Sequence, residues 1–221
     1  MNTLSLSQLP LFPLQTVLFP GGWLPLRVFE VRYLDMVRRC HKVGAPFGVV
    51  GLKQGSEVAS APRPGSAPAP TAFADLVFNE TATTEIYTLT QPQPGLLHIH
   101  CKGTQRFRVK EARLLKHGLW VADVEMLPAD LPAPVPDELA DTVSSLQKLL
   151  AALQTQTSQT QNLPIQPPLA WNDAGWVANR WCDVLPVSAD LKQRLMSLDN
   201  PLVRLELVGD VLEKLRLDSG R

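Results

Sequence analysis

The sequence predicts an α+β protein, in which a β-sheet region with one short helix precedes a C-terminal bundle of α-helices. Residues 72–126 contain short apolar runs separated by turn residues, which is typical of a compact barrel or sandwich. Residues 137–215 instead repeat apolar side chains at helical spacing. A proline-rich connector at 127–136 separates the two patterns. We therefore expect a β domain over residues 1–130 and a helical domain over residues 131–221.

The composition excludes several classes of protein. The 221 residues include 21 basic and 21 acidic side chains, and this zero net charge disfavours an ordinary DNA-binding domain. No apolar run is long enough for a membrane helix, and the N-terminus lacks the features of a secretory signal. The three cysteines, Cys40, Cys101 and Cys182, are widely spaced, which argues against a disulfide framework. A cytoplasmic protein with no membrane partner fits these observations best.

The first elements follow from the prolines. Four of the twenty prolines lie in residues 9–29, where they forbid a helix and predict extended segments at sheet edges. The Pro-Gly-Gly sequence at 20–22 predicts an exposed turn between two such segments. Residues 30–42 change to a spacing of three and four, which predicts a short amphipathic helix. Its apolar side consists of Tyr33, Met36, Val37 and Cys40.

The next elements are strands separated by turns. Residues 44–52 read as a buried strand, and residues 54–71, rich in Pro, Gly, Ser and Ala, read as a surface loop. Turn residues then separate five more apolar or β-branched runs. The expected strands are Phe73–Phe78, Thr84–Thr90, Leu96–Cys101, Arg106–Leu115 and Leu119–Met126.

The C-terminal third carries helix signals. Apolar stripes predict helices from 137 to 153 and from 171 to 185. Ser188 is expected to cap a third helix. Asn200 is expected to cap a fourth, with Pro201 at its first position, where proline is well tolerated. Together these segments predict a small helical bundle.

One long motif resembles a known family. Residues 9–33 contain Leu-Pro-Leu-Phe-Pro-Leu, then Val-Leu-Phe-Pro-Gly, then Leu-Pro-Leu-Arg-Val-Phe-Glu-Val-Arg-Tyr. This run closely resembles the opening of the Lon protease N-terminal domain. Shorter segments at 46–50, 103–109, 120–125 and 189–205 are similar to later parts of the same domain. The resemblance implies a PUA-like mixed β-barrel with a short helix, followed by a C-terminal α-helical bundle.

The resemblance also implies a function. In the full protease this region recognises substrates and helps to assemble the hexamer, but performs no chemistry. We therefore expect a non-catalytic module that binds unfolded or apolar peptide segments, with an ATP-dependent protease or other ATPase as a partner. The 221 residues contain no phosphate-loop spacing and nothing similar to the ATPase or protease modules. No catalytic residue, cofactor or enzymatic activity is expected.

Four aromatic residues are candidates for peptide binding. Phe19, Trp23, Phe29 and Phe107 all lie in the segments that carry the resemblance. Aromatic side chains on a surface would form an apolar groove for unfolded peptide. The alternative for each residue is packing in the core.

Four polar residues from the same segments form a second set. Glu30, Arg32, Tyr33 and Arg106 would form a charged rim beside such a groove. The favoured alternative is a network of salt bridges and hydrogen bonds that pins the helix at 30–42 to the barrel.

Two other functions are alternatives to peptide binding. PUA-like barrels often bind RNA, and one segment places five basic groups in eleven residues, so RNA or nucleotide binding is the alternative function. Net neutrality disfavours a nucleic-acid partner. His98 and His100 share one face of a strand, where they would suit a metal or an unrecognised hydrolase site, but an exposed polar face is favoured and no metal site is expected. The five basic residues are Arg106, Arg108, Lys110, Arg113 and Lys116.

Overall fold

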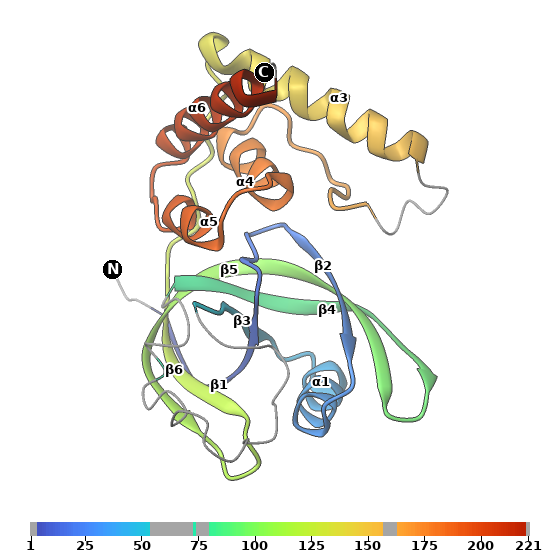
Figure 1. Ribbon diagram of the computed structural model, residues 1–221. Helices are drawn as coiled ribbons and strands as arrows, with labels where there is room; N and C mark the ends of the chain where they lie inside the picture. The colour runs from blue at the N-terminus through green and yellow to red at the C-terminus, as the bar shows by residue number, and fades with distance from the viewer. Residues whose placement is uncertain (1–3, 54–72, 74–79, 157–162, 220–221) are drawn as a thin grey trace, which may run out of the picture.

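The computed structural model describes residues 4–53, 73, 80–156 and 163–219 (Figure 1). The loop expected at 54–71 lies outside the described residues, and so does the strand expected at Phe73–Phe78, apart from Phe73. The strands are β1 (Ser5–Leu14), β2 (Trp23–Val28), β3 (Phe47–Gly51), β4 (Glu80–Gln93), β5 (Leu96–Leu114) and β6 (Trp120–Met126). The helices are α1 (Val31–Val43), η1 (Asp137–Leu139), α3 (Ala140–Gln156), α4 (Ala174–Val184), α5 (Ala189–Met196) and α6 (Pro201–Ser219).

The strands form one mixed sheet that closes on itself. Their order is β2-β5-β4-β3-β1-β6, and β5 also pairs with β6, so a ring forms with β2 attached outside it. The β1–β3 pair is parallel and the other pairs are antiparallel. Helices α3 to α6 gather on one side of the ring, and α1 lies toward the opposite side (Figure 1). The predicted α+β class is confirmed, although shifts of register make the ring less regular than a barrel.

The prediction of edge strands is confirmed for β2 and wrong for β1, which lies inside the sheet. Residues 5–11 of β1 pair with β6, and residues 11–14 pair with β3. Because β1 changes partner at Leu11, each half of the strand pairs on one side only among the described residues. Pro10 and Pro13, which have no N–H to donate, are therefore tolerated in the middle of the sheet.

Two predicted strands, Leu96–Cys101 and Arg106–Leu115, are halves of the single long strand β5. The glycine between them, Gly103, marks a close approach of another segment rather than the end of a strand. Gly21 N–H donates to the carbonyl of Gly103 at 2.8 Å, and Gly103 N–H donates to the carbonyl of Gly22 at 2.8 Å. A Cβ at position 103 would lie 2.2 Å from the carbonyl oxygen of Phe19.

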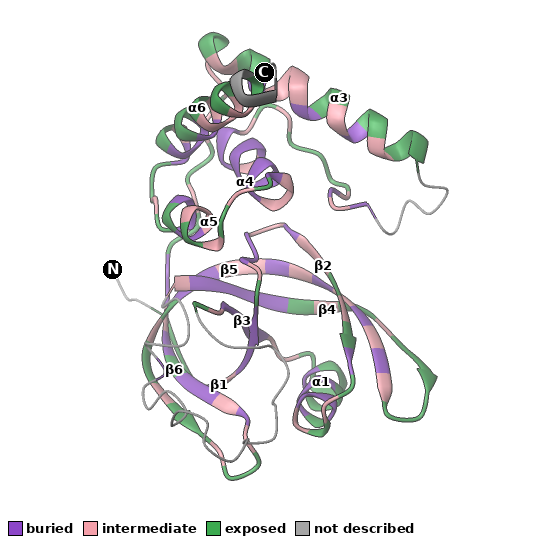
Figure 2. Ribbon diagram, viewed as in Figure 1, coloured by how far each residue is buried: buried purple, intermediate pink, exposed green. Residues whose placement is uncertain are grey.

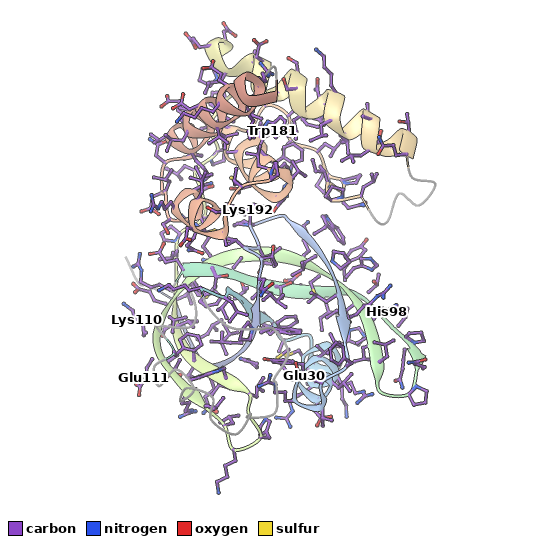
Figure 3. All side chains as sticks on the ribbon, viewed as in Figure 1. Glu30, His98, Lys110, Glu111, Trp181 and Lys192 are labelled. Atoms are coloured by element: carbon purple, nitrogen blue, oxygen red, sulfur yellow. The ribbon has the colours of Figure 1, made fainter. Side chains whose placement is uncertain are left out.

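The predicted helices and caps are confirmed. The helix expected at 30–42 is α1, which ends at Gly44 with a φ of 65° that suits glycine. Ser188 Oγ accepts a hydrogen bond from Leu191 N–H, and Asn200 Oδ1 accepts one from Leu202 N–H at 2.9 Å. Trp181 on α4 is buried among the helices and donates its indole N–H to the carbonyl of Thr142 (Figure 3). None of the helices in the described ranges has both the length and the apolarity needed to cross a membrane.

Among the residues that the structure describes, the buried apolar side chains form three clusters. Figure 2 shows buried residues in both the sheet and the helices. The first packs α1 against the sheet, with the rings of Phe12 and Tyr33 stacked at 4.2 Å. The second lies between β1, β3, β5 and β6, and includes Phe107. The third joins the helices, but it also contains Val17 and Phe19 from the connection between β1 and β2. A part of the predicted β domain thus packs with the helices, and the boundary at residue 130 stays a prediction.

Replacing Gly103 by alanine is expected to destabilise the protein. The added methyl group would overlap the backbone at Phe19 and disrupt the two hydrogen bonds that Gly103 makes with Gly21 and Gly22. We expect Gly103→Ala to lower the free energy of unfolding by about 3 kcal/mol in urea titrations.

Gly209→Ala is the matched control, because a Cβ there makes only ordinary contacts at 3.9 Å and beyond. Since alanine favours a helix interior, this variant is expected to keep or raise the free energy of unfolding, by up to about 1 kcal/mol. Equal effects of the two substitutions would contradict the close approach at Gly103.

Candidate functional site

The Pro-Gly-Gly turn, expected to be exposed, lies at the junction of the sheet and the helices. Phe19 is completely buried, so it packs in the core and does not line a surface groove. Arg180 on α4 donates a hydrogen bond from Nη2 to the carbonyl of Pro20 at 2.8 Å. A Cβ at Gly21 would lie 2.7 Å from Arg180 Nη1, and one at Gly22 would lie 2.9 Å from a carboxylate oxygen of Asp183. The turn is held between β5 on one side and α4 on the other.

A buried ion pair faces this turn from α4. Arg180 Nε and Asp183 Oδ2 lie 2.9 Å apart, with the Arg180 side chain 2% exposed and that of Asp183 12% exposed. Burial raises the pKa of the Asp183 carboxyl to about 6, although the positive charges of Arg180 and Lys192 lower it. Lys192, which reaches in from α5, donates to the carbonyl of Asp183 at 3.3 Å (Figure 3).

A second charged network joins the sheet to the helices through Arg106 and Arg204. Arg106 on β5 donates to the carbonyl of Met196 at 2.8 Å and to Asp199 Oδ1 at 3.0 Å. Arg204 on α6 makes two hydrogen bonds to the carboxylate of Asp130, at 2.5 and 3.2 Å. Arg106 Nη2 lies 3.6 Å from the same carboxylate. Two buried arginines thus share the carboxylate of Asp130, which lies in the connector between the sheet and the helices.

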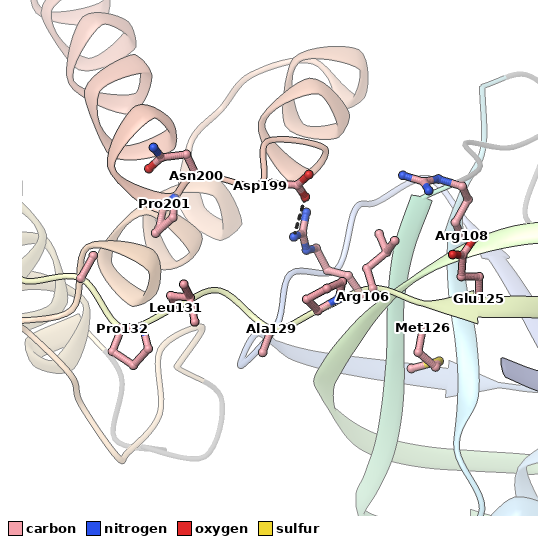
Figure 4. A pocket seen from close by; sticks show the side chains of 13 residues that line it. Arg106, Arg108, Glu125, Met126, Ala129, Leu131, Pro132, Asp199, Asn200 and Pro201 are labelled. Atoms are coloured by element: carbon pink, nitrogen blue, oxygen red, sulfur yellow. Dashed lines mark hydrogen bonds and ion pairs between the residues drawn. The ribbon is translucent and has the colours of Figure 1, made fainter. Parts of the chain in front are cut away.

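A cleft of about 810 Å³ opens beside Arg106, at the junction of the two regions (Figure 4). Its walls come from the end of β6, the connector after it, and the start of α6. Arg106, Arg108, Glu125 and Asp199 supply the charged groups. The remaining lining is mostly apolar and consists of Met126, Leu127, Pro128, Ala129, Leu131, Pro132, Ala133, Asn200 and Pro201.

The predicted rim residues fall into two separate places. Arg32 pairs with Glu30 at 2.9 Å and donates to the carbonyl of Gly118 at 2.7 Å, so it ties the start of α1 to the turn between β5 and β6. Its guanidinium carbon lies 4.6 Å from the ring centroid of Tyr33. Burial of Tyr33 raises its pKa to about 12. Arg106 takes no part in this network, because it contacts the helical region instead.

Of the four aromatic candidates, two remain accessible. Phe107 is fully buried beneath β3 and belongs to the core. Phe29 is 54% exposed and lines a shallow pocket of about 290 Å³ between β2 and α1. Trp23 is half-buried, and its ring meets that of Tyr87 edge to face at 4.8 Å. Tyr87, which the sequence did not single out, is 70% exposed.

Trp23 and Phe29 lie beside an open strand edge, and Tyr87 on β4 reaches the Trp23 ring across β5. Within the described residues, β2 pairs with β5 alone, and residues 23 to 28 are all in register with it. Trp23 lies at one end of the strand and Phe29 directly follows the other end. We call β2 together with Trp23, Phe29 and Tyr87 the β2 surface. At about 3.3 Å per residue, its edge has room for a segment of about six residues.

The basic run is largely neutralised by nearby carboxylates. Arg108 donates from Nη2 to Glu80 Oε1 at 2.6 Å, and this contact raises the pKa of Arg108. Lys110 forms an ion pair with Glu125. With Arg106 buried, only part of the run is available to phosphate groups.

The candidate metal ligands are not gathered into a cluster. His100 Nδ1 lies 2.9 Å from the hydroxyl of Thr88, and His98 lies on the same strand (Figure 3). Over the described ranges, no three His, Cys, Asp or Glu side chains are arranged to hold a metal ion. The three cysteines are free and buried, and burial raises the pKa of the Cys101 and Cys182 thiols to about 12.

The chain thus combines a closed mixed sheet, a group of helices joined to it, and an open strand edge with aromatic residues beside it. The family model of the ATP-dependent protease La (LON) substrate-binding domain matches residues 8–214. The chain therefore belongs to this family of Lon substrate-binding domains.

Solved structures agree with this assignment. The crystal structure of a Lon N-terminal domain protein from Xanthomonas campestris is 29% identical, with a TM-score of 0.66 and coverage of 92% of this chain and 97% of that one. The N-terminal domain of a Mycobacterium avium complex Lon protease, at 16% identity, has the same fold, with a TM-score of 0.52 and coverage of 93% and 96%. Protein cereblon from Danio rerio is 29% identical over 168 residues, which are 74% of this chain and 34% of cereblon, so the chain spans about a third of that protein.

Several residues of the site carry no local signal in the sequence. Asp130, Asp183 and Arg204 are charged residues in segments that read as a connector or as amphipathic helices. Their importance comes from contacts with residues that are distant in the sequence. Asp130 and Arg204, for example, are 74 positions apart. Buried charges need such partners, but one sequence does not show which charges become buried.

Removal of the shared carboxylate is expected to weaken the junction. Asp130→Asn would leave Arg106 and Arg204 buried without their common anion, so we expect the free energy of unfolding to fall by about 3–5 kcal/mol. Chemical denaturation measures this loss. Asp137→Asn, at an exposed position, is the control and should change the value by less than about 0.5 kcal/mol.

Asp183 is expected to make stability depend on pH. Folding raises the pKa of its carboxyl from 3.8 to about 6, so the folded protein binds more protons than the unfolded chain in this window. The protonated carboxyl of Asp183 therefore adds to the free energy of unfolding below pH 4, and this stabilisation is lost as the pH rises through 6. The wild-type free energy of unfolding, minus that of Asp183→Asn, should fall between pH 4 and pH 7. A constant difference would show that the group does not titrate in this way.

Proposed function

We propose that the protein is a non-catalytic module that binds unfolded or apolar polypeptide segments at the β2 surface. The observation that carries the proposal is an open strand edge with the accessible aromatic residues Trp23 and Phe29 at its two ends. Tyr87, on β4 beyond β5, extends this aromatic surface through its ring contact with Trp23. Membership of the Lon substrate-binding family supports protein substrates as the ligand class.

The binding would combine backbone pairing with apolar contact. An extended segment adds to the edge of β2 as a further strand, so its N–H and C=O groups pair without regard to sequence. Aromatic side chains at both ends of β2 then favour segments with apolar side chains. Pro25 in the middle of β2 supplies no N–H, which limits the number of hydrogen bonds and keeps β2 from pairing strongly with its own copies. A folded protein keeps its strands paired and would be rejected.

The small size of this surface suggests a partner. A site of about six residues gives weak binding, which gains from several sites or from coupling to a machine that pulls on the substrate. An ATP-dependent protease or other ATPase is the partner that suits this role. A reducing compartment such as the cytoplasm is consistent with three free, buried thiols.

RNA binding is less well supported than peptide binding. Arg108 and Lys110 each pair with a carboxylate and Arg106 is buried, so a phosphate backbone along this run would have to break two ion pairs and reach a buried guanidinium. An RNA-binding protein would show affinity that falls steeply with salt. We expect single-stranded RNA to bind weakly or not at all at physiological salt.

The proposal predicts selective binding to unfolded protein. Titration calorimetry with a reduced and alkylated model protein should give measurable binding, and its native form should give none. Tyr87→Ala and Phe29→Ala should each weaken the binding about five- to tenfold, because a partly exposed aromatic contact contributes about 1 kcal/mol.

Leu114→Ala provides the matched control, because Leu114 is also 54% exposed but lies at the far end of β5. This variant should bind like the wild type. Unchanged affinity in both aromatic variants would remove the β2 surface as the site. Equal binding, or equal lack of binding, to the unfolded and native forms would contradict the proposed function.

A further inference from the structure

We propose that the cleft beside Arg106 is a second ligand site, which binds the carboxyl terminus of an apolar polypeptide segment. The cleft shares no residue with the β2 surface. The proposal is therefore independent of peptide binding at that surface. It rests on three features of the cleft, namely its charge, its lining and the partners that already occupy the Arg106 guanidinium.

The charge at Arg106 depends on an exposed residue. Arg106 and Arg204 are both buried, and Asp130 is the partly buried anion that they share. Asp199 completes the balance of two cations and two anions, with Oδ1 at 3.0 Å from Arg106 Nη2. The side chain of Asp199 is 88% exposed, whereas that of Arg106 is only 5% exposed. The carboxylate of Asp199 is thus an exposed group that pairs with the buried guanidinium of Arg106.

Such a group can be exchanged for a ligand carboxylate. If the Asp199 carboxylate left Arg106, water would solvate it, so the cost of its leaving would be small. Arg106 would stay buried and would still need an anion. A carboxylate binds a guanidinium through strong, charge-assisted hydrogen bonds. The start of α6, whose first turn carries partial positive charge, lies in the same wall and favours an anion there.

The lining specifies the segment that precedes the carboxylate. Met126 and Leu127 are buried apolar residues of the lining, and Leu131, which also lines the cleft, is 81% exposed. Figure 4 shows Met126 and Leu131 among the lining side chains. Pro132 and Pro201 add rigid apolar walls. Apolar side chains next to the carboxylate would be removed from water by these contacts.

The existing partners of Arg106 favour a chain terminus. Its guanidinium already donates to the carbonyl of Met196 and lies 3.6 Å from the carboxylate of Asp130. Displacement of Asp199 would therefore free a single position on Arg106 for a ligand oxygen. A terminal carboxylate ends the chain at that point, which is why we assign the site to a C-terminus rather than to an internal acidic side chain.

Fluorescence anisotropy with the full chain tests the proposal. The probe is a fluorescein-labelled peptide of alanine and leucine with a free carboxyl terminus, compared with the same peptide ending in an amide. We expect the free acid to bind about tenfold more tightly than the amide. Asp199→Asn, which removes the competing carboxylate, should strengthen binding of the free acid several-fold and leave the amide unchanged.

Two further variants separate this site from the others. Glu206→Gln removes one charge from an exposed position on α6 outside the cleft, and should leave both affinities unchanged. Tyr87→Ala should leave the ratio of acid to amide affinity unchanged, even if the β2 surface also binds the peptide. If Tyr87→Ala bound the free acid and the amide equally well, carboxylate recognition would lie at the β2 surface, and the proposal would be overturned.

Three other results would overturn the proposal. The first is equal affinity for the free acid and the amide. The second is an unchanged affinity of the free acid in Asp199→Asn. The third is an amidated peptide with an internal aspartate that binds as tightly as the free acid, because the site would then accept any carboxylate.

Discussion

A turn of four residues, Phe19 to Gly22, is the contact on which the arrangement of the molecule depends. Gly103 of β5 pairs with the backbone of this turn on one side, and Arg180 of α4 binds it on the other. Gly21 has a φ of 75°, which favours glycine, and a Cβ at Gly22 would lie 2.9 Å from both the carbonyl oxygen of Phe19 and a carboxylate oxygen of Asp183. The turn also connects β1, which is a strand of the ring, to β2, which is attached to the ring through β5. The open edge of β2 is therefore a consequence of how the turn is held.

Buried arginines provide the second link between the sheet and the helices. Arg106, Arg180 and Arg204 are each at most 5% exposed, and each bonds to backbone carbonyls as well as to a carboxylate. Burying charge is costly unless every donor has an acceptor, so these contacts form only when the two regions meet in one orientation. The same need for an anion explains why Arg106, at the edge of the network, is suited to a ligand carboxylate.

Local features of the sequence were sufficient to predict most elements. The helix α1 follows from apolar spacing, and α5 and α6 follow from their caps at Ser188 and Asn200. Contacts between distant residues explain the errors. The strand β5 reads as two strands because Gly103 is a typical turn residue, and the turn after Phe19 reads as exposed because the helices that cover it come about 160 residues later.

The candidate site was predictable only in part for the same reason. Trp23 and Phe29 remain accessible, but Phe19 and Phe107 are aromatic residues of the same segments that pack in the core. Motif membership does not separate these two outcomes, since burial depends on the whole fold. Tyr87 joins the β2 surface because of the register of β4 and β2 on β5, which no local pattern reveals.

Amide hydrogen exchange, with and without a reduced and alkylated substrate protein, tests the role of the β2 edge most directly. A substrate strand that pairs with β2 should slow exchange in residues 23–29 and leave α3 unaffected. Unchanged exchange in β2 at a substrate concentration that saturates binding, or slowing confined to the helices, would contradict binding at this edge.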